Sequence, residues 1–266
     1  MINWSGTGMD SAVKADAELS VNVSSRDALL ADLEARLRTR RGFSVATLNL
    51  DHVVKLRSLS MFRDAYLRHS HVTADGNPIV WLSRLAGQKV DLVPGADLVD
   101  PVADVAASLG VPVAFLGSTE ASLAQAERVL STRYPGLHVV ARIAPPMGFD
   151  PTGEQGQEAI AQLQAAGARL VFLALGAPKQ EIFAALAQEK LPETGFLSIG
   201  AGLDFISGVQ TRAPKLARLL AVEWLWRLAT SPGRLAGRYG ACIAILPQLV
   251  WTALRSRGRS GQKLGT

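Results

Sequence analysis

Six short apolar runs, separated by helical patterns, constrain the fold of this chain more than any other feature. The runs span residues 43–49, 71–76, 111–117, 137–144, 168–176 and 195–202. Near-continuous apolar strands that alternate with helices are typical of a parallel sheet with both faces covered. The pattern therefore predicts an α/β fold with a Rossmann-like, doubly wound, mainly parallel sheet.

Charge divides the chain into a body and a basic C-terminal part. From Arg212 to the end there are ten Lys or Arg and one acid, a charge of +9, whereas residues 1–211 carry 18 basic and 22 acidic residues, a charge of −4. We expect an α/β domain over 1–210, a basic, aromatic-rich helical appendage over 211–254 and a disordered polar tail over 255–266. Because the body is near neutral, a nucleic-acid surface is not expected.

The appendage contains an apolar segment from Gly240 to Leu254 that is flanked by Arg238 and Arg255. It is too short to span a bilayer, which needs about 20 apolar residues. Arginines beside apolar and aromatic residues favour peripheral contact with a membrane. Packing on the domain and a contact in a homo-oligomer are the alternatives.

The remaining composition indicates a cytoplasmic protein that uses no metal or cofactor. The N-terminus lacks the basic start and apolar run of a signal peptide, and the single cysteine, Cys242, provides no disulfide framework. The four histidines have no ligand-like spacing. We therefore expect a location on the inner face of the cell membrane, reached from the cytoplasm.

Polar residues that directly follow the apolar runs are the candidates for function, since a parallel sheet binds ligands beyond the carboxyl ends of its strands. Asp75, in TADG, is compatible with three roles: a general base, a partner of a sugar hydroxyl, or a turn-former. The residues at these positions are Thr47, Asn49, Asp75, Gly76, Gly117, Ser118, Thr119, Gly176, Lys179, Gln180 and Asp204.

GAPKQE, residues 176–181, lies where a strand should turn into a helix. Gly176 would let the backbone approach a ligand, and the start of the helix would attract an anion or a carbonyl group. Lys179, Gln180 and Glu181 would line the rim, although an ordinary solvated first turn fits equally well. FLGST, residues 115–119, repeats this design, with Ser118 or Thr119 as a helix cap whose neighbouring N–H groups could hold a phosphate, although an ordinary cap fits at least as well.

GAGLDF, residues 200–205, begins like a dinucleotide-binding fingerprint. Phe205 occupies the place of the third glycine, and no clear helix follows. The sequence therefore disfavours a nicotinamide-dependent oxidoreductase.

Seven ordered stretches, between residues 43 and 239, together resemble the WecG/TagA/CpsF family of glycosyltransferases. They are TLNLDHVVKLR, TADGNPIVWLSRLAG, VPGADL, FLGSTEASLAQAERVLSTRYPGL, GAPKQE, SIGAGLDFISGVQTRAP and EWLWRLATSPGRLAGRY. The resemblance implies an inverting, metal-independent transfer from a UDP-sugar to a saccharide carried on polyprenyl diphosphate, in the synthesis of exopolysaccharide or cell-wall polymers. The sugar would be a hexose, an N-acetylhexosamine or its uronic acid.

The resemblance also implies roles for single residues. Asp75 matches the general base that deprotonates the acceptor hydroxyl, and Thr47, Asn49 and Gln180 match positions around the donor. Arg227, Arg234 and Arg238 match basic positions suited to a diphosphate. Gly117, Gly176 and Lys179, at the two helix starts, complete the predicted substrate site.

Leu92 stands where the family often has arginine, so the identity of the sugar does not carry over. Arg84 is a candidate substitute for that missing charge. A protein of another class, a non-catalytic module that binds a nucleotide or a lipid diphosphate, would keep the glycines and arginines but would need no base at Asp75.

Overall fold

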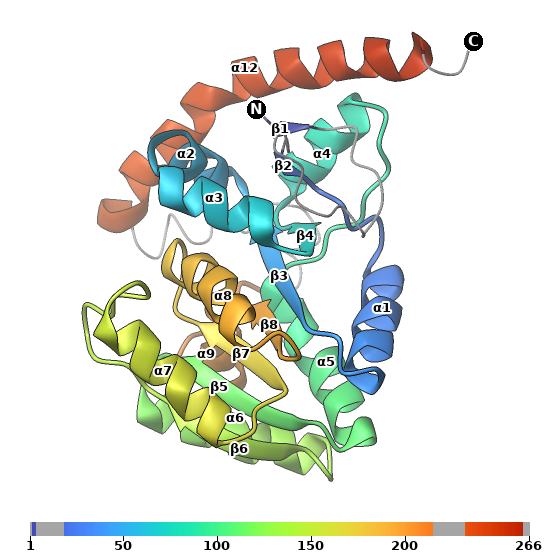
Figure 1. Cartoon of the computed structure of the whole chain (residues 1–266). Helices are drawn as coiled ribbons and strands as arrows, with labels where there is room; N and C mark the ends of the chain where they lie inside the picture. Colours follow the sequence, from blue (N-terminus) through green and yellow to red (C-terminus); the bar gives the residue numbers. More distant parts are fainter. Residues whose placement is uncertain (1, 4–18, 215–231, 263–266) are drawn as a thin grey trace.

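A computed structural model describes residues 2–3, 19–214 and 232–262, and its central sheet confirms the predicted α/β class (Figure 1). All six strands of this sheet are parallel, in the order β4-β3-β8-β7-β5-β6. In chain order they are β3 Phe43–Leu48, β4 His71–Ala74, β5 Pro112–Gly117, β6 His138–Ile143, β7 Leu170–Ala174 and β8 Gly195–Ser198.

Each of the six predicted runs contains one of these strands, but several strands are shorter than their runs. β4 ends at Ala74 and β8 at Ser198. Gly76 and Gly200 follow them with φ angles of 112° and 55°, a region that glycine enters without strain and that extended chain does not use. A second sheet, of β1 Ile2–Asn3 and β2 Leu19–Ser20, was not predicted.

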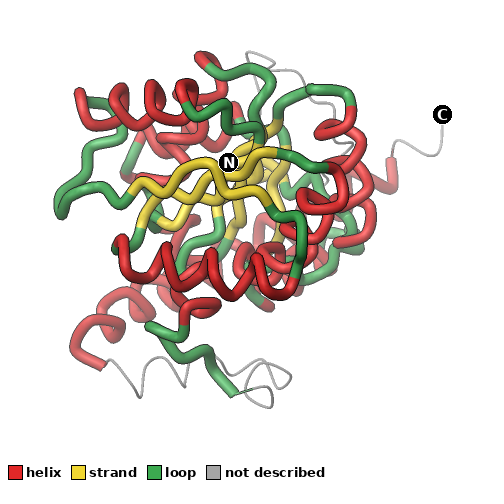
Figure 2. The backbone as a smooth tube through the Cα atoms, turned by 90° about the horizontal axis from the view of Figure 1, so that it is seen from below, coloured by secondary structure: helices red, strands yellow, loops and turns green. Residues whose placement is uncertain are grey.

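Helices connect the strands and cover both faces of the sheet (Figure 2). They are α1 Arg26–Arg38, α2 Leu50–Ser58, α3 Ser60–Arg68, α4 Asn77–Leu85, α5 Gly95–Leu109, α6 Glu120–Arg133, α7 Glu154–Ala165, α8 Lys179–Lys190, α9 Gly202–Ser207 and α12 Pro232–Gln262. The short helix α9 was not predicted: it begins inside GAGLDF, at Gly202, and ends at Ser207, and the third glycine of the dinucleotide fingerprint is absent.

Alternating residues of the strands show which helices lie on which face. Phe115 and Phe172 pack in one core cluster with residues of α1, α5, α6 and α9. Their neighbours Leu116 and Leu173 point the other way and pack with residues of α7 and α8. On that second face, Leu48 of β3 packs with residues of α2 and α3, so α2, α3, α7 and α8 lie on the face opposite α6 and α9.

Helix α12 lies across α2 and α4 at the β3–β4 end of the sheet (Figure 1). Ile245, Leu249 and Ala253 belong to the same core cluster as Leu48. The helix runs through Pro247 and on to Gln262, so the predicted disorder is wrong for residues 255–262; residues 263–266 lie outside the described part. Arginine favours helix, and this segment extends a helix that is already anchored by its packing.

We expect Leu249→Ala to lower the free energy of unfolding by about 2–4 kcal/mol, because Leu249 is only 5% exposed and its removal leaves a cavity under α12. Leu254→Ala is the matched control on the same helix, since Leu254 is 47% exposed and should cost less than about 0.5 kcal/mol. Denaturant unfolding of both variants measures the difference. Equal effects would contradict the packing of α12 described above.

Candidate functional site

The carboxyl ends of the central strands form the candidate site. β5 leads into α6 on one face of the sheet, and its neighbour β7 leads into α8 on the other. β8 and β3 diverge in the same way, toward α9 and α2. Neighbouring connections that leave on opposite faces open a crevice where such sheets bind ligands. The predicted residues that follow these strands therefore gather at one edge of the sheet.

Asp75 and Thr47 meet at this edge. Thr47 is the second-last residue of the fully buried strand β3, and its hydroxyl donates to Oδ2 of Asp75 at 3.3 Å. The backbone N–H of Asp75 donates to the carbonyl oxygen of Leu48 at 2.8 Å, so the residue is held at both its main chain and its side chain. Asp75 is half-buried and lies two residues before the start of α4. A general base needs this combination of a fixed position and access to the crevice.

Two buried side chains, Tyr66 and His52, hold the main chain of Thr47 by hydrogen bonds. The Tyr66 hydroxyl donates to the carbonyl oxygen of Thr47 at 3.1 Å and lies 2.6 Å from Nδ1 of His52. Because the phenol has one proton and donates it to Thr47, His52 carries its proton on Nδ1 and donates to Tyr66. Burial lowers the pKa of His52 to about 3, so this imidazole is neutral at physiological pH.

Asn49 and Asp51 follow β3 and organise the start of α2. The Asn49 side chain accepts from the backbone N–H of His52 at 3.0 Å, so Asn49 caps this helix. Asp51 instead binds two cations through Oδ2: Lys55 at 2.8 Å and Arg238 of α12 at 2.7 Å. Two partly exposed cations around one carboxylate leave a net positive charge beside the crevice.

GAPKQE forms the turn from β7 to α8. Gly176 has a φ of 71°, and Lys179 is the first residue of the helix. Gln180 is buried: its Oε1 accepts from the backbone N–H of Gly200 at 3.2 Å, and its Nε2 donates to Oε1 of Glu181 at 2.8 Å. The amide of Gln180 thus holds the turn that follows β8.

Glu181 does not line a solvated rim, as the sequence suggested, but is fully buried. Its Oε2 has no hydrogen-bond partner among the described residues. Burial raises the pKa of Glu181 to about 7, against the opposing effects of the Gln180 hydrogen bond and the charge of Lys55. Burial has the largest effect on the Tyr66 phenol and raises its pKa, and the charges of Glu181 and Asp75 raise that pKa further. Both carboxyl groups therefore lie near Tyr66.

The second helix start, after β5, is held by hydrogen bonds between its own side chains and α9. Gly117 is required by the backbone: its φ is 118°, and a Cβ atom there would lie 2.3 Å from the carbonyl oxygen of Ala174. Thr119 caps α6, while the Ser118 hydroxyl donates to the Asp204 carboxylate, which also accepts from the Ser122 hydroxyl at 2.8 Å. A phosphate at this helix start would meet the negative charge of Asp204. We therefore expect the phosphates to bind nearer to β3 and β7.

Leu92 lies beside the candidate base. It forms an isolated parallel bridge with Ala74, the residue before Asp75, and its side chain is 40% exposed. Arg84, the suggested substitute, is exposed on α4.

The remaining predicted arginines are described only in part. Arg227 lies outside the described residues, and for Arg234 the structure gives only its place in α12. Within the described ranges no group of three or more His, Cys, Asp or Glu side chains could hold a metal ion. The absence of a metal requirement stays a prediction.

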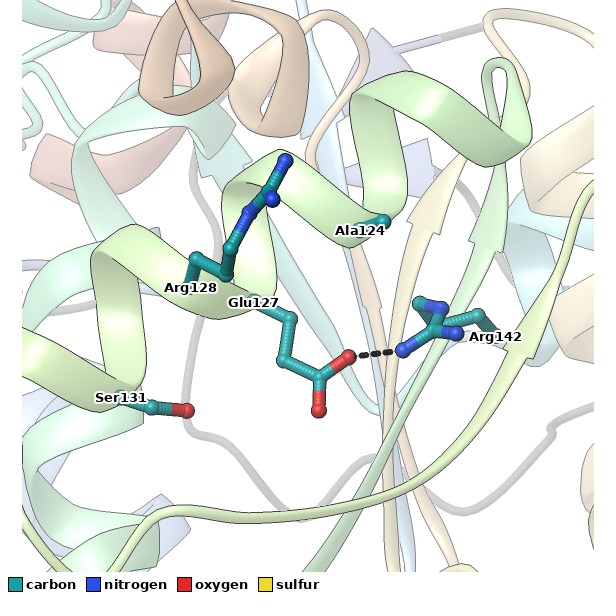
Figure 3. Close-up of a pocket in the computed structure, with 5 residues that line it drawn as sticks. All are labelled: Ala124, Glu127, Arg128, Ser131 and Arg142. Atoms are coloured by element: carbon teal, nitrogen blue, oxygen red, sulfur yellow. Dashed lines mark hydrogen bonds and ion pairs between the residues drawn. The ribbon is translucent and has the colours of Figure 1, made fainter.

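A shallow hollow lies elsewhere, between α6 and the edge strand β6 (Figure 3). It is lined by Ala124, Glu127, Arg128, Ser131 and Arg142. The Arg142 guanidinium is already paired with Glu127 and, at 2.9 Å, with Glu120. None of the residues predicted from the sequence lines this hollow, so it is not the candidate site.

Glu181→Gln should become more stable, relative to the wild type, as the pH rises. The folded pKa of about 7 lies above the ordinary value of 4.5, so the contribution of Glu181 is fully present below pH 4.5 and is lost as the pH rises through 7. Between pH 5 and pH 8 the difference in unfolding free energy should change by about 2.5 kcal/mol. Denaturant unfolding measures it, with the exposed Glu189→Gln as control; a difference that does not change with pH would contradict this account.

Comparison with known families assigns the chain to one of them. The family model described as glycosyl transferase WecG/TagA/CpsF family matches residues 16–263, nearly the whole chain, and so includes every predicted site residue. This match confirms the resemblance seen in the motifs. The chain therefore belongs to the WecG/TagA/CpsF family of glycosyltransferases, and its role is that of a glycosyltransferase in the synthesis of polysaccharide or cell-envelope polymers.

Proposed function

We propose that the protein transfers a sugar from a UDP-sugar to a saccharide carried on polyprenyl diphosphate, with inversion and without a metal. The observation that carries this proposal is the placement of Asp75 beside Thr47, at the edge of a crevice, in a chain that the family model matches over residues 16–263. The hexose, N-acetylhexosamine and uronic acid alternatives for the donor remain part of the proposal.

Asp75 acts as the base in this mechanism. Its carboxylate takes the proton of the acceptor hydroxyl while that oxygen forms a bond to the anomeric carbon of the donor. The bond from the anomeric carbon to the diphosphate oxygen breaks, and UDP leaves with the electron pair. Attack on the face opposite the leaving group inverts the anomeric centre. The hydrogen bond from Thr47 keeps the carboxylate oriented during this step.

The departing diphosphate requires positive charge. Lys55 and Arg238 are 29% and 44% exposed, and both lie against Asp51 after β3. Lys55 also donates to the carbonyl oxygen of Ala177, in the turn that carries Gly176. The two cations thus join α2, α12 and the β7–α8 turn on one side of the crevice. Together with Lys179, Arg227 and Arg234 they supply the charge stabilisation that the leaving group needs.

Asp75→Asn should lower kcat by about two to four orders of magnitude, the usual scale for loss of a general base, while binding of the donor is largely kept. The amide keeps the size of the carboxylate and can still accept from Thr47. UDP release from a panel of UDP-sugars, with a synthetic prenyl-diphosphate sugar as acceptor, measures turnover.

The same assay separates the rival functions. A loss of less than about tenfold would remove Asp75 from the role of base. If the wild type binds UDP but transfers no sugar from any donor, the chain is a binding module. Turnover that EDTA abolishes and Mn²⁺ or Mg²⁺ restores would overturn the metal-independent mechanism.

The lipid carrier requires contact with a membrane, and α12 offers a surface for it. No helix in the described part of the chain has the length and apolar character needed to cross a bilayer. Opposite its buried seam, however, α12 exposes Ile243, Val250, Trp251 and Leu254. The Arg255 guanidinium lies 4.4 Å from the centre of the Trp251 ring, and no acidic residue occurs between Pro232 and Gln262. We propose that this outer stripe binds the surface of an anionic membrane.

The double variant Trp251→Glu with Leu254→Glu should bind anionic vesicles at least about tenfold more weakly, because it removes apolar burial and adds two negative charges at the surface. Vesicle sedimentation measures the binding. Met147→Glu, a fully exposed apolar residue between β6 and α7, is the control and should not change it. Point variants are preferable to deletion of α12, which would uncover the core around Leu249. Unchanged sedimentation of the double variant would contradict the proposed membrane surface.

A further inference from the structure

The buried carboxyl group of Glu181 has no role in the mechanism above, although it lies in the first turn of α8 at the edge of the candidate site. Elements that are distant in sequence surround it. Lys55 of α2 and Tyr66 of α3 are the charged and titratable groups that interact with it electrostatically. A carboxyl group in such a place is costly to bury, so its position calls for a physical explanation.

The explanation lies in the amide of Gln180. An amide side chain can be turned so that its oxygen and its nitrogen exchange places. Oε1 of Glu181 accepts from Nε2 of Gln180 at 2.8 Å, which leaves Oε1 of Gln180 to accept from the Gly200 N–H at 3.2 Å. The opposite orientation would set two acceptors, the amide oxygen and Oε1 of Glu181, against each other, and two donors, the amide NH₂ and the Gly200 N–H, against each other. Glu181 thereby selects the orientation of Gln180.

Gly200 connects the Gln180 side chain to other elements at this edge of the sheet. It follows β8 with a φ of 55° and is followed at once by α9, Gly202–Ser207. α9 carries Asp204, whose carboxylate accepts from the hydroxyls of Ser118 and Ser122 after β5. A continuous set of contacts therefore runs from α8 through the Gly200 turn to the start of α6, across the carboxyl ends of β7, β8 and β5.

We propose that Glu181 is a positioning residue for glycosyl transfer, which acts through Gln180 on the Gly200 turn. This inference rests on the proposed function, because its effect on turnover presupposes a transferase. Glu181 touches neither substrate in this proposal; it sets the geometry of the turn that borders the crevice. A misplaced turn should impair the chemical step more than binding, since transfer depends on alignment of the reacting atoms.

Four variants test the proposal: Glu181→Met, Glu181→Gln, Gln180→Met and the double variant Gln180→Met with Glu181→Met. Methionine has a similar length but accepts hydrogen bonds only weakly, whereas glutamine keeps an oxygen for Nε2 of Gln180. We expect Glu181→Met to lower kcat by about 10- to 100-fold with less than about a threefold change in KM. Glu181→Gln should restore most of that loss.

The double variant shows whether Glu181 acts through Gln180. If it does, adding Glu181→Met to Gln180→Met should lower kcat by no more than about threefold further, because the contact is already lost. Glu189→Met on the same helix is the matched control: its carboxylate pairs with Arg68 and is 60% exposed, so kcat should stay at the wild-type value. The proposal is overturned if Glu181→Met keeps wild-type kcat, if Glu181→Gln is as impaired as Glu181→Met, or if the two losses multiply.

Hydrogen exchange of the Gly200 amide provides a readout that needs no activity. Gln180→Met should increase its exchange rate at least about tenfold, because it removes the acceptor of that N–H. An unchanged rate would disprove the link from Gln180 to the turn, even if Glu181→Met did not fold. If the rate changes as expected but the wild type transfers no sugar, the link within the structure stands and the proposed function fails instead.

Discussion

The positions of all the candidate residues depend on the parallel register of the central sheet. Val45, Leu197, Phe172 and Phe115 form one continuous row across β3, β8, β7 and β5, and all four pack on the same face. Side chains alternate along a strand, so a slip of one residue would turn this row away from its helices. Burial of the row thereby fixes where each strand ends, and it aligns Thr47 with the turns at Gly117, Gly176 and Gly200.

The polar side chains at this edge are used largely to hold the backbone in place. Asn49 caps α2, Gln180 holds the Gly200 turn and Asp204 joins α9 to the start of α6. A site built in this way is organised before its substrate binds, which reduces the ordering cost of binding. It follows that a substitution at Asn49 or Gln180 alters both the shape of the crevice and any direct contact with substrate. Loss of activity in such a variant does not by itself identify a contact.

The strands and the general location of the site could be predicted from the sequence, because strands covered on both faces leave long apolar runs and ligands bind beyond their ends. Contacts between elements that are distant in the sequence could not be predicted in this way. GAPKQE resembles a solvated helix start, whereas in the structure α3 packs on α8 and Glu181 is fully buried. α9 was missed because its six residues include a glycine and have weak helix propensity, whereas Leu203 anchors it in the core. The arginine-rich end was predicted to be disordered from its composition alone. Composition does not show that this segment continues a helix that is anchored by packing.

Helix α12 connects the proposed membrane surface to the proposed site through a shared core. Leu249 on its inner side packs in the same cluster as Leu48 and Ala74, the last residues of β3 and β4, and Asp75 directly follows Ala74. The ion pair between Arg238 and Asp51 adds a second attachment next to the crevice. Because interiors are close-packed, movement of α12 along the sheet would require this core to repack. The height of Asp75 above a bound membrane would therefore be set by the packing of Leu249, which suits an acceptor whose diphosphate is held at the lipid surface.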